Sequence, residues 1–409
     1  MYKPNLKTIL LIGLIIFISI FPRLWKLEQK PPIIVDEYAN IRMIKSLLEN
    51  RNFNPLEFHW DYSKTIFTYY PTILLIKLTG TGNDLFYLRL TSVIYSLLAL
   101  IPFFLLTRRL TTNVTAFATT LLFANSYYFL QFSRVGWIDI TFGVASGLFL
   151  ILFLQKAFDR KENLRLNWVV ASGITAGIIF HAYRGANVLI FLSYSYLIFL
   201  LFTNHISFKK SFMTFGLFFF TFLFISLPWL IKISKNLDKY NLRANVVYIK
   251  NARIPYHGLS LKRDIMKYQI LTSVKSWIFL EGVVGGSEET PRYLPETFPP
   301  LNIFVRISFW AGMIISILNY HYLKKTGFWL LIIITTIIFG QILTVHPPNG
   351  ARGLIMLPSY YIIASIFFYK IHEVSGKSKV VLAGITLLSF IFSIQDFLFY
   401  QFWMEWIKV

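Results

Sequence analysis

The chain has 409 residues, of which 56% are hydrophobic and only 14% are charged, and its mean hydropathy is +0.57. This composition excludes a soluble globular protein and a disordered chain. The net charge of +21 does not indicate nucleic-acid binding, because most of the basic residues lie in short loops between apolar runs. The absence of cysteine excludes disulfides, thiolate metal sites and cysteine nucleophiles. We therefore expect an all-α polytopic integral membrane protein.

Apolar runs long enough to cross a bilayer recur along the sequence. About 20 apolar residues are needed for one crossing. We predict about 11 transmembrane helices, with a short fifth one, near residues 8–24, 86–106, 113–132, 138–155, 167–181, 186–203, 211–231, 302–320, 327–345, 353–370 and 380–395.

The basic loops predict the orientation. Loops after even-numbered spans carry clusters that include Arg108, Lys156, Lys209, Lys324 and Lys377, and the N-terminus carries Lys3 and Lys7. Cytoplasmic loops are enriched in Lys and Arg. The sequence thus predicts a cytoplasmic N-terminus and an outer C-terminus, as an odd number of spans requires.

Two long segments, about 25–85 and 232–301, then fall on the outer side, and we expect one transmembrane domain over 1–409 without an appended soluble domain. In the first segment, Ile41, Ile44, Leu47 and Leu48 share one helical face. This spacing predicts an amphipathic helix at the membrane surface, with Asp36 near its N-cap.

The acidic pair Asp36-Glu37 allows two interpretations. Acidic residues at a helix N-terminus accept hydrogen bonds from free N–H groups and interact favourably with the helix dipole. Alternatively, one carboxylate at the bilayer surface acts as a general base on an acceptor hydroxyl.

Several outer arginines stand where topology does not require a positive charge. Arg89 opens the second span, and Arg134, Arg184 and Arg352 each lie in a short outer loop beside a compact polar motif. Single arginines at this depth are often anchors at the lipid interface, but the set together favours anion binding. Asp139 either pairs with Arg134 or orients a ligand, and a divalent cation at this position is an alternative that the sequence leaves open.

Motifs for several common chemistries are absent from the sequence. There is no Gly-rich phosphate loop followed by Lys-Ser or Lys-Thr, no Gly-x-Ser-x-Gly and no His-Glu-x-x-His. Nucleotide-driven transport and serine or zinc hydrolysis therefore have no support.

Taken together and in order, four short motifs resemble the GT-C superfamily of glycosyltransferases. These are the acidic pair after span one, Phe-Tyr-Leu-Arg-Leu-Thr-Ser at 86–92, Ser-Arg-x-Gly-Trp-x-Asp at 133–139 and a late Pro-Pro-x-Gly-x-Arg-Gly at 347–353. The nearest branch resembles the protein O-mannosyltransferases, with the bacterial transferase of aminoarabinose to lipid A. The similarity covers roughly 1–370.

This resemblance implies an inverting enzyme that takes a sugar from a polyprenyl-phosphate carrier. It assigns Asp36 as the base, Glu37 as its partner, Asp139 as a second acidic position and Arg89 as a ligand of the lipid phosphate. Arg352 resembles a late arginine near the donor headgroup, and we add Arg134, Tyr183 and Arg184 from the outer loops as donor-binding candidates.

The expected partners are a polyprenyl-phosphate sugar, membrane lipids and a lipid, glycan or protein acceptor, with no nucleic acid. We expect the plasma membrane of a prokaryote, with the active site outside. A transporter or flippase of a lipid-linked glycan is the main rival, although such proteins place ionisable residues near the bilayer midplane and show repeats. A polymerase or ligase of surface polysaccharide is the second rival.

Overall fold

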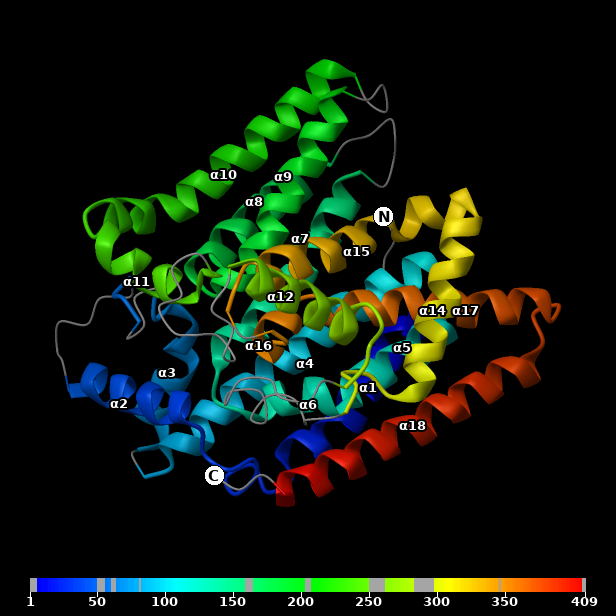
Figure 1. Cartoon of the computed structure of the whole chain (residues 1–409), viewed down its shortest axis with the longest axis horizontal. Helices are drawn as coiled ribbons and strands as arrows, with labels where there is room; N and C mark the ends of the chain where they lie inside the picture. The colour runs from blue at the N-terminus through cyan, green and yellow to red at the C-terminus, as the bar shows by residue number, and fades with distance from the viewer. Residues whose placement is uncertain are drawn as a thin grey trace.

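Most of the part of the chain that the structure describes is helical. The computed structural model describes residues 6–49, 56–59, 64–80, 82–158, 165–202, 207–249, 262–282, 298–345 and 347–406. Parts of both predicted long outer segments lie outside these ranges. Figure 1 shows α8, α9 and α10 together at one end of the view, with α18 along the opposite edge.

In the described part of the first half of the chain, long helices alternate with short ones. The helices are α1 (Leu6–Leu24), α2 (Val35–Glu49), η1 (Phe67–Tyr69), α3 (Tyr70–Thr79), α4 (Asp84–Leu110), α5 (Asn113–Asn125), α6 (Tyr127–Arg134), α7 (Ile138–Ala157), α8 (Leu166–His181), η2 (Arg184–Ala186) and α9 (Asn187–Phe202).

The described part of the second half is also built of long and short helices, and it contains the π-helical segment η4. Its helices are α10 (Phe208–Ser234), α11 (Leu237–Val247), α12 (Lys262–Trp277), α14 (Ile303–Leu318), α15 (Tyr320–Ile337), η4 (Ile338–Ile342), α16 (Gly350–Gly353), α17 (Leu357–Val374) and α18 (Lys379–Trp406).

Helices occupy most of every apolar run that the sequence predicted to cross the membrane. Seven of the described helical stretches are long and apolar enough to span a bilayer, and α8 and α14 are shorter apolar helices. An integral membrane protein is confirmed, whereas the number of eleven spans is not. The run 113–132 differs from the prediction because it breaks at Ser126, whose hydroxyl accepts a hydrogen bond from the N–H of Phe129 and starts α6.

Glycines allow the closest approach between neighbouring helices. A Cβ on Gly173 of α8 would lie 2.8 Å from the carbonyl oxygen of Phe218, and one on Gly177 would lie 2.6 Å from Ile225 of α10. In a membrane, where lipid is as apolar as the helix surface, such backbone approach and van der Waals packing stabilise helix pairs. The pair α8 and α10 is thereby held beside α7 and α9.

The predicted amphipathic helix exists as α2. Its Ile44 is buried with Tyr69, Ile73, Leu88 and Ile138, and Ile41, Leu47 and Leu48 pack around this cluster. The apolar face of α2 therefore contacts α3, α4 and α7, and the first turn of α2, which carries the acidic pair, is held against the rest of the chain.

Candidate functional site

A cavity of about 630 Å³ lies where several helices end. Trp137 precedes α7, the segment 183–187 joins α8 to α9, and Thr336, Phe339 and Gly340 belong to α15 and η4. The basic residues of the short loops lie at the other ends of these helices: Lys156 ends α7, and Lys324 lies in the first turns of α15. The cavity is thus on the side of the helices away from the basic loops.

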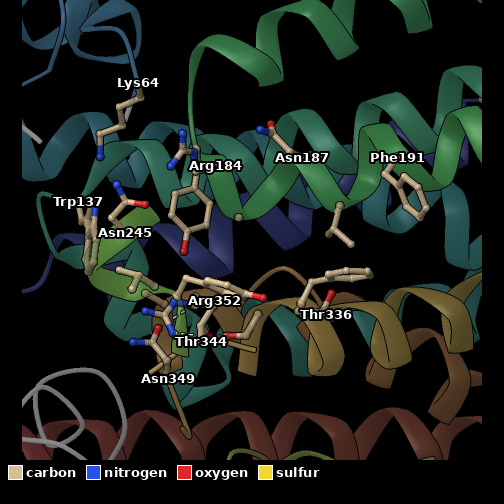
Figure 2. A pocket seen from close by; sticks show the side chains of 18 residues that line it. Lys64, Trp137, Arg184, Asn187, Phe191, Asn245, Thr336, Thr344, Asn349 and Arg352 are labelled. Carbon is tan, nitrogen blue, oxygen red and sulfur yellow. Dashed lines mark hydrogen bonds between the residues drawn. The ribbon is translucent and has the colours of Figure 1, made fainter. Parts of the chain in front are cut away.

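One end of the cavity is basic and polar. Lys64, Arg184 and Arg352 gather there with Asn245 and Asn349 (Figure 2). Among the described residues that line the cavity, none is an aspartate or a glutamate. Guanidinium groups bind phosphate through paired hydrogen bonds, so this end is suited to an anionic group.

Arg184, at the basic end of the cavity, has a hydrogen-bond donor without an acceptor in the described residues. Its guanidinium stacks 4.0 Å from the centre of the Tyr240 ring, and Nη2 donates a hydrogen bond to the Tyr240 carbonyl at 3.3 Å. Nη1 is buried and has no hydrogen-bond partner among the described residues. The neighbouring Tyr183 also lines the cavity. An unsatisfied buried donor is costly, so a bound anion would supply the missing acceptor.

Arg352 is held by a compact turn. Its backbone N–H donates to Oδ1 of Asn349 at 3.1 Å, and Nη1 donates to Oγ1 of Thr344 at 2.6 Å and to the carbonyl of Val345 at 3.0 Å. Gln341, a buried residue of η4, exchanges two hydrogen bonds with the backbone of Asn349, at 2.8 and 3.0 Å. The π-helical segment thereby fixes the turn that carries Arg352.

Lys64 reaches the cavity wall as half of a buried ion pair. Its Nζ lies 2.6 Å from Oδ2 of Asp139, and the Tyr69 hydroxyl donates to Oδ1 at 2.9 Å. Asp139 therefore pairs with Lys64 and not with Arg134, the partner that the sequence suggested for closing the turn. The carboxylate holds a cation at the cavity.

Glu37 and Arg89 form a second buried ion pair, outside the cavity lining. Nε and Nη2 of Arg89 donate to the two carboxylate oxygens of Glu37 at 2.7 and 2.8 Å. Glu37 also accepts from the N–H groups of Gly136, at 2.7 Å, and Ile34, at 3.1 Å. Arg89 Nη1 donates to the Leu27 carbonyl at 2.8 Å. Both charged groups are therefore already satisfied by the protein.

Asp36, the predicted base, is half-buried in the first turn of α2 and is not among the residues that line the cavity. One helical turn later, Asn40 donates to the carbonyl of Gly136 at 3.0 Å and lies 3.0 Å from the His59 ring. That ring stacks on Tyr69 at 5.2 Å, and Tyr69 binds Asp139. These contacts join the helix that carries Asp36 to the Lys64 side of the cavity.

Arg134 lies near the Glu37–Arg89 pair and away from the cavity. It is buried, and its guanidinium donates to the backbone carbonyls of Pro22, Trp25 and Lys30. It also lies over the Tyr400 ring. Its contacts hold the segment after α1 against α18, and the structure does not bring it to the cavity.

Lys64 is the residue of the basic end that the sequence prediction missed. The signal that indicated the arginines applied to Lys64 as well: a positive charge in a predicted outer segment, directly before the apolar run 66–76, that the predicted topology does not require. Asn245 and Gln341 gave no such signal, because uncharged amides are common in loops and at helix ends.

A metal site is not assembled in the part of the chain that the structure describes. No group of three or more His, Asp or Glu side chains is arranged there to hold a metal ion. Both oxygens of Asp139, which the sequence proposed as a cation ligand, contact Lys64 and Tyr69.

The other end of the cavity is apolar. Val188, Phe191 and Phe339 line it, and Figure 2 shows Phe191 and Thr336 at the end away from the arginines. The rings of Phe191 and Phe339 lie 6.4 Å apart, yet are 57% and 54% exposed. Phe199 on α9 and Ile334 on α15 are exposed as well. The apolar end therefore lies beside exposed apolar side chains of α9 and α15, which are suited to contact lipid.

Comparison by sequence connects part of the chain to one family. Residues 63–231 match the family described as dolichyl-phosphate-mannose-protein mannosyltransferase. No curated protein matches the sequence.

Solved structures match over most of the chain. Apo ArnT from Cupriavidus metallidurans has a TM-score of 0.59 at 13% identity, over 87% of this chain and 59% of ArnT. ArnT bound to undecaprenyl phosphate has a TM-score of 0.56 at 14% identity, over 88% of this chain and 59% of ArnT. The apo oligosaccharyltransferase of Archaeoglobus fulgidus has a TM-score of 0.59 at 14% identity, over 95% of this chain and 56% of that protein.

At these identities the likeness shows the fold, and this chain spans less than two thirds of the length of either neighbour. The family match and the structural matches together confirm the resemblance to the GT-C glycosyltransferases that the motifs predicted.

Proposed function

Because the chain has the GT-C membrane fold, we propose that it is a glycosyltransferase that moves a sugar from a polyprenyl-phosphate donor to an acceptor hydroxyl, with inversion. The observation that carries this proposal is the division of the cavity into a basic end and an apolar end. The arginines at the basic end suit a phosphate, and the apolar end lies between the exposed rings of Phe191 and Phe339, where a lipid chain would enter. The neighbour ArnT was crystallised with undecaprenyl phosphate, an anion on a lipid chain of this kind.

The donor phosphate is assigned to the basic end. When the bond between the sugar anomeric carbon and the phosphate oxygen breaks, the phosphodiester with one negative charge becomes a phosphomonoester that gains a second. Arg184 and Arg352 lie where they would stabilise that developing charge, with Lys64 as a third cation. No nucleotide-binding motif is required, because the leaving group is already a phosphate ester.

The acceptor hydroxyl is assigned to Asp36. Its carboxylate takes the hydroxyl proton while the oxygen attacks the anomeric carbon on the face opposite the phosphate, which inverts that centre. The network through Asn40, His59 and Tyr69 supports this assignment, since it fixes α2 relative to the cavity.

The other predicted site residues receive supporting roles in this proposal. Glu37 and Arg89 hold the first turn of α2 in place, since each is already paired within the protein. Asp139 holds Lys64, and Arg134 holds the segment that leads into α2. In this proposal the lipid phosphate is therefore bound by Arg184 and Arg352, and not by Arg89 as the resemblance implied.

The charge pattern supports a location for the active site. The cavity lies at helix ends away from the basic loops, which supports an active site on the outer face of the membrane. The prokaryotic origin of the structural neighbours supports a prokaryotic plasma membrane.

The test is transfer by the purified chain in proteoliposomes, with a radiolabelled sugar on polyprenyl phosphate as donor. We expect the label to reach an acceptor from cell-envelope extracts and polyprenyl phosphate to be released. The same sugar on a nucleotide should give no product. Movement of the intact lipid-linked sugar across the bilayer without transfer would contradict the proposal and support the flippase alternative.

A further inference from the structure

The helix α12 has its polar and apolar sides reversed relative to a helix on a water-facing surface. Most of the side chains that it turns toward the rest of the chain are polar: Gln269, Thr272, Ser273 and Ser276 are buried, together with the apolar ring of Trp277 at the last residue of the helix. The exposed ones include Met266, Ile270 and Leu271, with 36%, 42% and 49% of their surface accessible. A helix on a water-facing surface buries its apolar side instead. The exposed side of α12 is therefore suited to an apolar environment.

That exposed side continues onto a helix that faces lipid. Phe279, just after α12, is 53% exposed and stacks on Trp310 of α14 at 6.3 Å. The apolar helix α14 exposes Ile307 and Ile314 to the surroundings. The exposed apolar surface of α14 therefore continues through Trp310 to Phe279, at the end of α12.

Positive charges accompany the apolar residues on α12. Arg263, Lys267 and Lys275 are exposed and follow one another at four- and eight-residue spacing, in the same row as Leu271. Asp264 is the one acidic residue of this helix. Alternating apolar and basic side chains on an exposed face are typical of a helix that lies on an anionic lipid surface.

We propose that α12 is an interfacial helix that binds an anionic phospholipid surface, with Ile270 and Leu271 in the lipid and Arg263, Lys267 and Lys275 at the headgroups. The helix is also fastened to the cavity wall. Its Gln269 donates to the carbonyl of Thr344 at 3.0 Å, and Thr344 is the residue whose hydroxyl binds Arg352. Lipid binding by α12 thus acts next to the turn that carries Arg352.

The absence of cysteine from the chain makes a direct test possible. Single variants Ile270→Cys and Leu271→Cys of the full chain are labelled with a fluorophore in nanodiscs of phosphatidylcholine and phosphatidylglycerol. Ile307→Cys on α14 is the lipid-facing control, and Ser46→Cys, on the exposed polar face of α2, is the water-facing control.

We expect nitroxide-labelled lipid to quench the fluorophores at residues 270 and 271 as strongly as the one at 307, with little quenching by aqueous iodide. The fluorophore at 46 should show the opposite behaviour. If residues 270 and 271 behave as residue 46 does, α12 faces water or a protein partner and the proposal is wrong. The measurement requires no sugar donor, so its outcome is independent of the proposed glycosyltransferase activity.

The charge requirement is tested on the Leu271→Cys background. The double change Lys267→Gln and Lys275→Gln should remove the increase in lipid quenching that phosphatidylglycerol produces over phosphatidylcholine alone. Lys377→Gln with Lys379→Gln, a matched pair before and at the start of α18, should leave that increase unchanged. An increase that survives the first pair would overturn the assignment of an anionic lipid.

Discussion

Nζ of Lys64 lies 2.6 Å from Oδ2 of Asp139, and both side chains are buried although 75 residues separate them in the sequence. The aspartate also accepts from the Tyr69 hydroxyl. A lysine at the cavity wall is thus held in one position before any ligand binds. Pre-positioned charge of this kind stabilises a developing negative charge without reorganisation.

Replacing Asp139 should therefore destabilise the protein. Asp139→Asn leaves the buried ammonium of Lys64 without a counter-charge, and the expected loss is roughly 3–5 kcal/mol of unfolding free energy, as for other broken buried pairs. Tyr69→Phe removes one hydrogen bond to the same carboxylate and should cost only about 0.5–1.5 kcal/mol. Thermal denaturation in one detergent compares the two. Equal melting temperatures for Asp139→Asn and the wild type would refute the pairing.

Asp36→Asn should separate catalysis from binding. The amide keeps the size and the hydrogen-bonding capacity of the side chain but is not a base, so turnover should fall by roughly 10²–10⁴. Donor affinity and thermal stability should remain at the wild-type values. The control is Glu49→Gln at the exposed end of the same helix, which should leave turnover unchanged. If Asp36→Asn had normal turnover, Asp36 would not be the base, and its carboxylate would serve only to cap the helix.

Arg184→Gln should weaken donor binding and slow transfer together. In the proposed complex the guanidinium contacts the donor phosphate, and its contribution increases as the leaving group gains charge, so KM should rise and kcat should fall. One charged hydrogen bond corresponds to roughly a 10- to 100-fold loss. Arg184→Lys should recover only part of it, because an ammonium lacks the planar fork of the guanidinium. Lys239→Gln on the neighbouring α11 is the neutral control. If the kinetics of Arg184→Gln were unchanged, the assignment of the donor phosphate to this end of the cavity would be wrong.

Arg89→Met should mainly reduce stability. It leaves the buried carboxylate of Glu37 without its cation, at an expected cost of about 3–5 kcal/mol, whereas the double change Arg89→Met with Glu37→Leu should be clearly milder. Melting temperatures of the single and double variants measure this difference. A single variant of normal stability that has lost donor affinity would instead restore Arg89 as the phosphate ligand.

Reporter fusions should place Asp36 and Arg352 on one side of the membrane and Arg108, Lys209 and Lys324 on the other. The first two should be outside and the last three in the cytoplasm, because Lys and Arg accumulate in cytoplasmic loops. Fusions after each residue to a periplasmic and to a cytoplasmic reporter make the assignment. If Asp36 and Arg352 were on opposite sides, the base and the donor phosphate could not meet.

The helices were predictable because their signal is local. A bilayer core requires each spanning segment to satisfy its own backbone hydrogen bonds, so an apolar run of sufficient length becomes a helix. The break at Ser126 was not predicted, since a single serine within a long apolar run does not by itself indicate the start of a new helix. The helix α2 was predicted from the spacing of its apolar residues. That spacing does not say what the apolar face contacts, and the structure shows that it contacts other helices of the same chain.

The candidate site was only partly predictable. Arg184 and Arg352 were recognised as basic residues where topology does not require charge, and both line the cavity. Arg89 and Arg134 gave the same signal, but they bind Glu37 and backbone carbonyls elsewhere. Identical residues in similar loops thus have different partners, because each partner comes from a distant part of the chain.

The sequence by itself determined that this is a helical membrane protein, and it predicted that the polar motifs share one face, because hydrophobic length and loop charge act segment by segment. Only the tertiary structure decided which charges are paired and which face the cavity. Glu37 and Arg89 are 52 residues apart, and the Lys64–Asp139 pair forms only where α7 packs against the segment before α3. Such pairings depend on how helices pack, which no local pattern encodes.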